Sequence, residues 1–267
     1  MVTRFPDHVL PAGGPRPAHA AACATPPARR LTRDAPWYWE KFDFFDEADD
    51  AARRAFFDDA RKTEYRKNET IFTPTDPASR IFYLMSGMVK IYHVSAGGDP
   101  TIFWYCVPGD LFGAGGLSGS LVQSVYGEAT ESSVIYTISR SAFESLLKSF
   151  PQLALNVIRL MGARLRLACD SMTDLASQSA DVRLARALLR LANNCGVRDG
   201  ERVLLKIRIT HEELANMIGS SRQTVNEALR EFSSRNLIEV TRRVITLPSP
   251  DRLQALIDSA PDRSERR

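Results

Sequence analysis

The side chains best suited to specific chemistry lie between residues 210 and 230, in the sequence THEELANMIGSSRQTVNEALR. One face of its second half carries two arginines and two amides, at Arg222, Gln223, Asn226 and Arg230. Such groups can hydrogen-bond to base edges in the major groove and donate to phosphates. The segment is therefore a candidate for reading double-stranded DNA.

The order of signals in this segment predicts two short helices joined by a tight turn. The first helix is expected from Glu212 to Ile218, with Thr210 as its N-cap. Gly219 follows, and glycine takes a left-handed conformation at little cost. The second helix is expected from about Arg222 to Glu231, capped by the serine pair before it. A helix-turn-helix presents the start of its second helix to the major groove, whereas an ordinary helical hairpin with a solvated face is the alternative.

The residues after the second helix complete a longer pattern. Residues 235–240 lead into residues 241–247, which are expected to form a small two-stranded wing. The run LANMIGSSRQTVNEALREFSSRNLIE resembles the winged helix-turn-helix of the Crp/Fnr family of bacterial transcription regulators. The resemblance implies DNA contacts at Thr210, Ser221, Arg222, Gln223, Thr224, Asn226, Glu227, Arg230, Arg242 and Arg243.

Base readout is expected to differ from that of the cAMP-responsive relatives, whose recognition helix reads S-R-E-T-V-x-R. Residues 221–227 read SRQTVNE at the same positions. Arg222 matches and is expected to pair with guanine through O6 and N7. Gln223 stands where the relatives have a glutamate, and an amide can pair with adenine. Glu227 replaces the second arginine, which removes one guanine contact, while Arg230 is expected at a phosphate.

Residues 66 to 139 contain short β-forming runs separated by turn signals. The runs are Glu69–Phe72, Ile81–Met85, Met88–Val94, Thr101–Val107 and Val134–Ile138. Many short antiparallel strands at this spacing predict a small barrel or roll. KNETIF, IFYLMSGMVKIY and PGDLFG resemble the strands of a cyclic-nucleotide-binding β-roll of the same family. The resemblance spans about residues 44–247 and implies an α+β fold with a β-roll, a long dimerisation helix and a winged helix-turn-helix.

The pocket of the expected roll departs from the cAMP-binding members, in which an acidic residue binds the ribose and an Arg-Ser pair holds the phosphate. Ala114 stands at the acidic position and Gln123 at the arginine. A buried phosphate needs a charge-assisted donor, so tight cAMP binding is not expected. Backbone N–H groups of the glycine-rich loop could form an anion nest, or the loop is a turn that closes the roll. The expected effector pocket consists of Phe112, Gly113, Ala114, Gly115, Gly116, Leu117, Gln123, Ser124 and Cys169.

Cysteine and histidine placement argues against the metal-dependent sensors of the family. There is no C-x-x-C pair, and only Cys23 lies near the N-terminus, so the cysteine cluster of the oxygen-sensing Fnr type is not expected. Residues 110–112 are followed by glycine and alanine instead of the Cys and His of the CO-sensing haem type. His93 is a lone candidate ligand, with a solvated or hydrogen-bonded histidine as the alternative. No metal or cofactor is expected, and Cys169 is either a redox thiol or a small buried residue.

A long helix is expected from Pro151 to about Ala176, because its apolar residues recur at steps of three and four. They are Leu153, Val157, Leu160, Met161, Leu165, Ala168, Met172 and Leu175. This stripe is typical of a helix packed on a partner. The resemblance implies a dimer interface at Val157, Leu160, Met161, Leu165, Ala168 and Met172, with packing against the chain's own roll as the alternative. A hinge follows at residues 177–180, before a helix from Asp181 to Asn193.

Length, composition and charge indicate the class of protein and its division into domains. The chain has 267 residues with 44% hydrophobic and 25% charged residues, as expected for a protein that can bury a core. A net charge of +3 is too small to indicate nucleic-acid binding without local clustering. No run is apolar enough to span a membrane, since the best one, residues 153–168, contains three arginines. The expected divisions are a disordered tail at 1–36, the roll at 37–150, the helix and hinge at 151–178, the winged domain at 179–248 and a tail at 249–267.

Together these patterns predict a cytoplasmic, homodimeric transcription regulator that binds double-stranded DNA. Its expected further partners are RNA polymerase and an unidentified small-molecule or redox effector. The alternative is a ligand-binding module whose winged domain contacts a protein instead of DNA. An enzyme is not expected, because the sequence offers no metal-ligand spacing, nucleophile elbow or phosphate-cradling loop.

Overall fold

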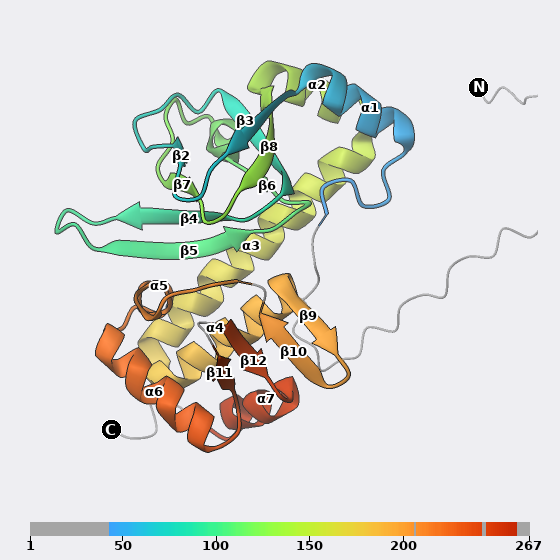
Figure 1. Cartoon of the computed structure of the whole chain (residues 1–267). Helices are drawn as coiled ribbons and strands as arrows, with labels where there is room; N and C mark the ends of the chain where they lie inside the picture. Colours follow the sequence, from blue (N-terminus) through green and yellow to red (C-terminus); the bar gives the residue numbers. More distant parts are fainter. Residues whose placement is uncertain (1–42, 206, 242–243, 261–267) are drawn as a thin grey trace, which may run out of the picture. The chain divides into compact units, whose positions relative to one another are not determined.

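The computed structural model describes residues 43–260 except 206 and 242–243 (Figure 1). Two four-stranded antiparallel sheets form a β-roll in the first half of these residues. One sheet has the order β1 (Arg61–Tyr65), β8 (Ser133–Ser139), β3 (Arg80–Ser86) and β6 (Leu111–Phe112). The other has the order β2 (Thr70–Phe72), β7 (Tyr126–Ala129), β4 (Val89–Val94) and β5 (Pro100–Cys106). The predicted α+β fold with an antiparallel roll is confirmed.

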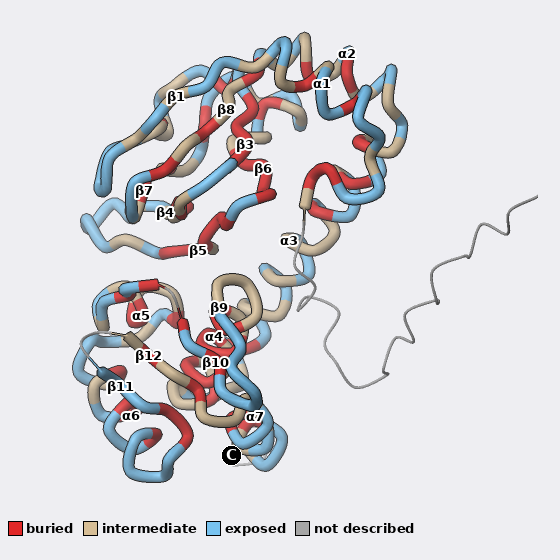
Figure 2. Tube along the Cα trace, turned by 45° about the vertical axis from the view of Figure 1, so that its right-hand side comes forward, coloured by how far each residue is buried: buried red, intermediate tan, exposed pale blue. Residues whose placement is uncertain are grey.

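β3 and β6 contain runs of buried residues, drawn red in Figure 2. Two clusters of buried side chains stabilise the roll. In the first cluster the rings of Phe72, Phe82 and Phe112 stack at centroid distances of 5.2 and 5.3 Å. In the second, Phe44 and Phe45 pack against α1 (Asp50–Asp59) and α2 (Arg140–Ser149). These two phenylalanines are at most 1% exposed, so they are core residues.

The long helix α3 (Pro151–Ser177) presents two different apolar faces. Leu153 and Leu160 are buried in the second cluster of the roll. Asn156, also buried, donates from Nδ2 to the carbonyl oxygens of Phe44 at 2.9 Å and Asp46 at 2.7 Å. The sequence-based assignment of Leu160 to a dimer interface is therefore wrong, because its side chain is only 3% exposed within its own chain. Val157 also packs partly against this core.

The C-terminal half contains the winged helix-turn-helix. Its elements are α4 (Ala180–Cys195), β9 (Gly196–Asp199), β10 (Arg202–Leu205), α5 (His211–Ile218), α6 (Arg222–Ser234), β11 (Glu239–Thr241), β12 (Val244–Leu247) and α7 (Pro250–Asp258). The four strands form one antiparallel sheet in the order β11-β12-β10-β9. Helices α4, α5 and α6 share a core that includes Leu188, Leu214 and Phe232.

Candidate DNA-binding face and effector pocket

Three local features define the start of α5, the turn after it and the start of α6. Thr210 forms a capping box with Glu213, whose carboxylate accepts from the Thr210 backbone N–H at 2.9 Å. Gly219 ends α5 with φ 59°, the left-handed conformation that glycine adopts most easily. The hydroxyl of Ser221 accepts from the Thr224 backbone N–H at 3.0 Å and caps α6. Both N-caps and the turn are as predicted from the sequence.

One face of α6 is buried and the other is exposed. Val225, Ala228, Leu229 and Phe232 are at most 4% exposed and anchor the helix. Arg222, Gln223, Glu227 and Arg230 are exposed. Neither arginine has a hydrogen bond or ion pair with any other described residue, so both guanidinium groups are available to a partner. Gln223 donates from Nε2 to the Glu227 carboxylate at 3.0 Å, so one oxygen of that carboxylate already accepts a hydrogen bond within α6.

Two further predicted contact residues, Asn226 and Thr210, also have structural partners. Asn226 is half-buried, and its side-chain oxygen contacts Nδ1 of His211, which joins the start of α5 to α6. Thr210 lies at the exposed end of α5 with its hydroxyl engaged by Glu213 at 3.0 Å. His211 is a supporting residue that sequence reasoning missed, because the contact joins positions 15 residues apart. Arg242 and Arg243 lie outside the described residues.

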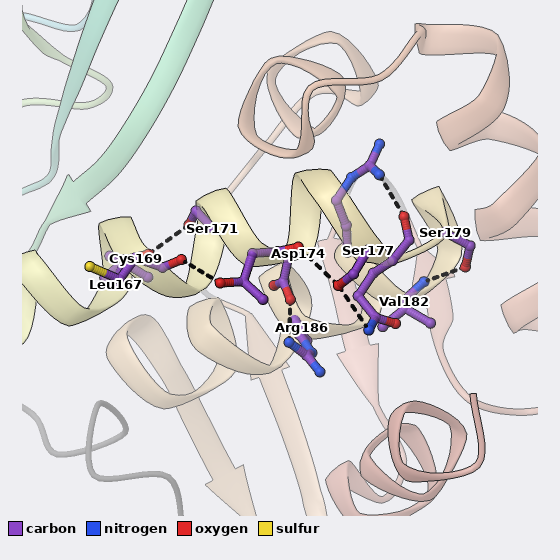
Figure 3. Close-up of polar contacts among 11 residues, drawn as sticks. Leu167, Cys169, Ser171, Asp174, Ser177, Ser179, Val182 and Arg186 are labelled. Atoms are coloured by element: carbon purple, nitrogen blue, oxygen red, sulfur yellow. Dashed lines mark hydrogen bonds and ion pairs between the residues drawn. The ribbon is translucent and has the colours of Figure 1, made fainter. Parts of the chain in front are cut away.

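A polar cluster joins α3 to the helix-turn-helix across the hinge. Asp174 is buried and forms an ion pair with Arg186 of α4 (Figure 3). Burial raises the pKa of the Asp174 carboxyl, and the positive charges of Arg186 and Arg190 oppose that shift. Arg183 donates from Nε to the Ile218 carbonyl at 2.8 Å and from Nη1 to the Gln178 carbonyl at 2.9 Å. One guanidinium thus connects the end of α3 to the turn before α6.

A cavity of about 730 Å³ lies between the roll, α3 and the adjoining ends of α4 and α5, and Met161, Leu165 and Met172 of the exposed α3 face are among its lining residues. Six of the nine predicted pocket residues line it, namely Phe112, Gly113, Ala114, Gly115, Gln123 and Ser124. The other three, Gly116, Leu117 and Cys169, are not among its lining residues. The prediction also missed the aromatic wall formed by Phe72, Trp104 and Tyr105, which comes from strands distant in sequence.

Close packing explains the glycine-rich loop without an anion. A Cβ at Gly116 would lie 1.8 Å from the Ala78 carbonyl oxygen. Gly113 has φ 70°, and a Cβ there would lie 2.4 Å from the Phe82 ring. Gln123 is 4% exposed and donates from Nε2 to the Gly113 carbonyl at 3.2 Å. The arrangement supports the turn interpretation over an anion nest, since these glycines are required by the fold.

Arg164 of α3 supplies a positive charge to the same cavity. Its guanidinium carbon lies 5.0 Å from the centroid of the Trp104 ring, and its Nη2 donates to the Leu111 carbonyl oxygen. Arg190 is the other charged lining residue, and no aspartate or glutamate of the described residues lines the cavity. The site is therefore apolar with a positive potential.

The described cysteines differ in exposure. Cys169 is exposed on α3, which is contrary to the alternative of a small buried residue. Burial raises the pKa of Cys106 and of Cys195 to about 12 in both cases. His93 is exposed, and the described residues contain no group of three or more His, Cys, Asp or Glu side chains placed to hold a metal ion. Nor does any described helix combine the length and apolarity needed to cross a membrane.

An antiparallel roll, a long helix and a winged helix-turn-helix with two exposed arginines define a DNA-binding regulator, and a cavity lies beside the roll. Comparison with known families agrees: the cyclic nucleotide-binding domain matches residues 62–150, and the Crp-like helix-turn-helix domain matches residues 182–256. The chain belongs to the Crp/Fnr family and is a transcription regulator of that type.

Individual relatives support this assignment. The chain is 27% identical over 198 residues to the CRP-like cAMP-activated global transcriptional regulator of Mycobacterium tuberculosis, a match covering 71% of this chain and 85% of the relative. It is 28% identical over 200 residues to Electron transport regulator A of Shewanella oneidensis, covering 75% and 80%. The fold is similar to that of FixK2 from Bradyrhizobium japonicum, with a TM-score of 0.66, 24% identity, and coverage of 76% and 99%.

Proposed function

We propose that this regulator acts in the cytoplasm as a homodimer whose α6 helices read two DNA half-sites, and that its effector is not cAMP. The observation that carries the DNA-binding part is the exposed pair Arg222 and Arg230 on a helix capped and buried on its other side. Arg222 stands at the first position of α6, where a recognition helix meets base edges. RNA polymerase is the partner through which such a dimer would act on transcription.

The exposed face of α3 supports the dimer. Ile158, Met161, Leu165, Ala168, Met172 and Leu175 are all exposed and follow steps of three and four residues. Such a heptad seam packs against an identical helix, and symmetric dimers are the commonest assembly. Of the predicted interface residues, Met161, Leu165, Ala168 and Met172 belong to this seam. Ile158 and Leu175 extend it.

Salt-dependent binding to duplex DNA tests the DNA-binding part. Phosphate contacts release counterions, so the logarithm of the binding constant should fall linearly with the logarithm of salt concentration. Absence of duplex binding by the dimer, together with capture of a protein through the winged domain, would support the ligand-binding module with a protein partner instead.

The effector part is tested by calorimetry with cAMP. Ala114 and Gln123 line the cavity at the positions where the cAMP-binding relatives have a carboxylate for ribose and a guanidinium for phosphate; Arg164 reaches the cavity from α3 instead, and no described carboxylate lines it to bind ribose. We therefore expect no tight binding. Micromolar or tighter affinity for cAMP would contradict this part of the proposal and leave the DNA-binding part intact.

A further inference from the structure

The cavity beside the roll and α3 has the size and lining of a site for a small organic molecule. Its volume of about 730 Å³ lies within the range of small-molecule pockets, roughly 300–1,000 Å³. Apolar side chains form most of the wall: Phe103 is exposed and Trp104 and Val125 are half-buried, whereas Phe72, Ile91 and Phe112 line the cavity but are at most 3% exposed. Flat aromatic walls favour a ring-bearing ligand, because rings stack on or meet the edges of other rings at close range.

Arg164 is placed to contact a ligand in this cavity. One N–H of its guanidinium is used by the Leu111 carbonyl, and the guanidinium group lies over Trp104. Arginine has five N–H donors in a fixed fork, and no described carboxylate forms a salt bridge with Arg164. The remaining donors match a carboxylate, which arginine binds with two parallel hydrogen bonds.

The charges of the lining residues indicate which charge a ligand of this cavity should carry. Arg164 and Arg190 line the cavity and no described acidic residue does, so an anion is favoured over a neutral or cationic compound. Arg190 also lowers the pKa of the Asp174 carboxyl, so the negative charge of Asp174 partly offsets the positive charge of Arg190. Arg164 is therefore the main anion partner.

We infer that the effector is an organic acid with an aromatic or similar apolar ring, its carboxylate paired with Arg164 and its ring in the part of the cavity beside Trp104. This inference rests on the proposed function in one respect, that the cavity is the effector site. Such a ligand has one charged group and a ring where a cyclic nucleotide has its sugar and phosphate.

Calorimetry on the full-length protein with acids and their neutral alcohols tests the inference. The pairs are benzoate and benzyl alcohol, naphthoate and naphthylmethanol, and indoleacetate and indole-ethanol. At least one acid should bind about tenfold more tightly than its alcohol, since a charge-assisted contact is roughly twice as strong as a neutral one. Arg164→Gln should abolish that preference, and Arg164→Lys should retain part of it because the charge remains. Arg166→Gln removes the same charge two residues further along α3, outside the cavity lining, and should leave the preference unchanged.

The inference is overturned if none of the acids binds, if each acid and its alcohol bind equally, or if the preference survives Arg164→Gln. Thermal melting of each variant separates a lost contact from a lost fold. Duplex-DNA binding by the same preparations keeps the two proposals apart. DNA binding without acid binding rejects the ligand class alone, whereas acid binding without DNA binding supports the pocket and rejects the proposed dimeric DNA reader.

Discussion

Arg222 illustrates how a single side chain acquires a function from its position. It follows the Ser221 N-cap directly, is exposed, and has no protein partner among the described residues. Arg230 lies on the same exposed face two turns later and is equally available. A base contact carries sequence information, whereas a phosphate contact mainly sets register and affinity. We therefore expect the two arginines to make different contributions to DNA binding, which can be measured separately.

Replacement of each arginine by alanine should give distinct results in DNA-binding titrations. Arg222→Ala should cost about 1–3 kcal/mol on the preferred site and flatten the preference at one G·C pair. Arg230→Ala should weaken all sequences about equally and reduce the salt slope by about one. Equal effects of both changes on specific and non-specific duplexes would contradict the separation of roles.

The cysteines should differ in reactivity toward iodoacetamide. The thiolate is the nucleophile, and a pKa of about 12 keeps Cys106 and Cys195 protonated at pH 8. In a Cys23→Ser protein, mass spectrometry should therefore find the label at Cys169, which is exposed. Rapid labelling of Cys106 or Cys195 in the folded protein would show that their burial is not as described.

Residue types alone predicted the turn chemistry well and the supporting contacts poorly. Thr210, Gly219 and Ser221 were predictable because caps and turns depend on neighbours in sequence. Gln123 was interpreted only as a lost arginine, although its amide braces the loop by donating to the Gly113 carbonyl. That role depends on which distant segments meet, and no local pattern encodes it. The same holds for the contact between His211 and Asn226.

At the scale of elements, α3 combines two functions in one helix. The sequence shows one run of apolar residues, but Leu153 and Leu160 face the core whereas Leu165 and Met172 are 67% and 71% exposed. A helix with 3.6 residues per turn can carry both faces, so the apolar pattern alone could not assign Leu160 correctly. The exposed heptad seam is the face of α3 that we propose packs against a second subunit.

Lysine at both Leu165 and Met172 should convert the dimer to monomers. A charge at either position would have to lose its hydration in a helix–helix seam, which is costly without a partner. Sedimentation velocity measures the change, and Leu121→Lys serves as control because Leu121 is 85% exposed in a loop of the roll. A persistent dimer in the double variant would mean that subunits associate through another surface.

The ion pair across the hinge should be important for stability. Arg186→Met leaves the buried Asp174 carboxylate without its partner and should cost about 3 kcal/mol at neutral pH, the lower end for a buried pair, because Arg186 is partly exposed. Removing Arg186 raises the pKa of Asp174 further, so the loss should shrink as pH falls and the carboxyl takes up a proton. Urea unfolding at neutral and acidic pH measures this dependence.

The double variant Asp174→Asn/Arg186→Met is the control for that experiment. It removes the unpaired carboxylate, so it should recover part of the lost stability at neutral pH and show little of the pH dependence. An Arg186→Met loss that stays constant from acidic to neutral pH would contradict a role for the Asp174 charge.

Most strands of the roll were predictable, and the strands of the roll that lay outside the predicted runs have a common cause. β1 has the sequence RKTEY, which lacks an apolar alternation because it is an edge strand paired only with β8 and largely exposed. β6 has two residues and β7 contains Gly127, which must be small because a Cβ would lie 2.7 Å from the Phe72 ring. Their strand conformation is imposed by partners and not by propensity.

At the scale of the whole molecule, shared helices connect the cavity to α6, the proposed DNA-reading helix. α3 contributes Arg164 to the cavity, the exposed heptad seam, and Asp174 to the hinge. Arg183 then connects that hinge to the turn before α6. A two-fold dimer with these parts should present two α6 helices to one face of the duplex. The expected half-sites are therefore inverted repeats about one helical turn apart, ~34 Å.

In-vitro selection from random duplexes tests this account most directly, performed with the full-length protein and with Arg222→Ala. The wild-type protein should select an inverted repeat with half-sites about one helical turn apart, containing a G·C pair whose preference disappears in the variant. If neither protein enriches an inverted repeat, or if Arg222→Ala selects the wild-type motif with undiminished preference at every position, α6 does not read DNA as proposed.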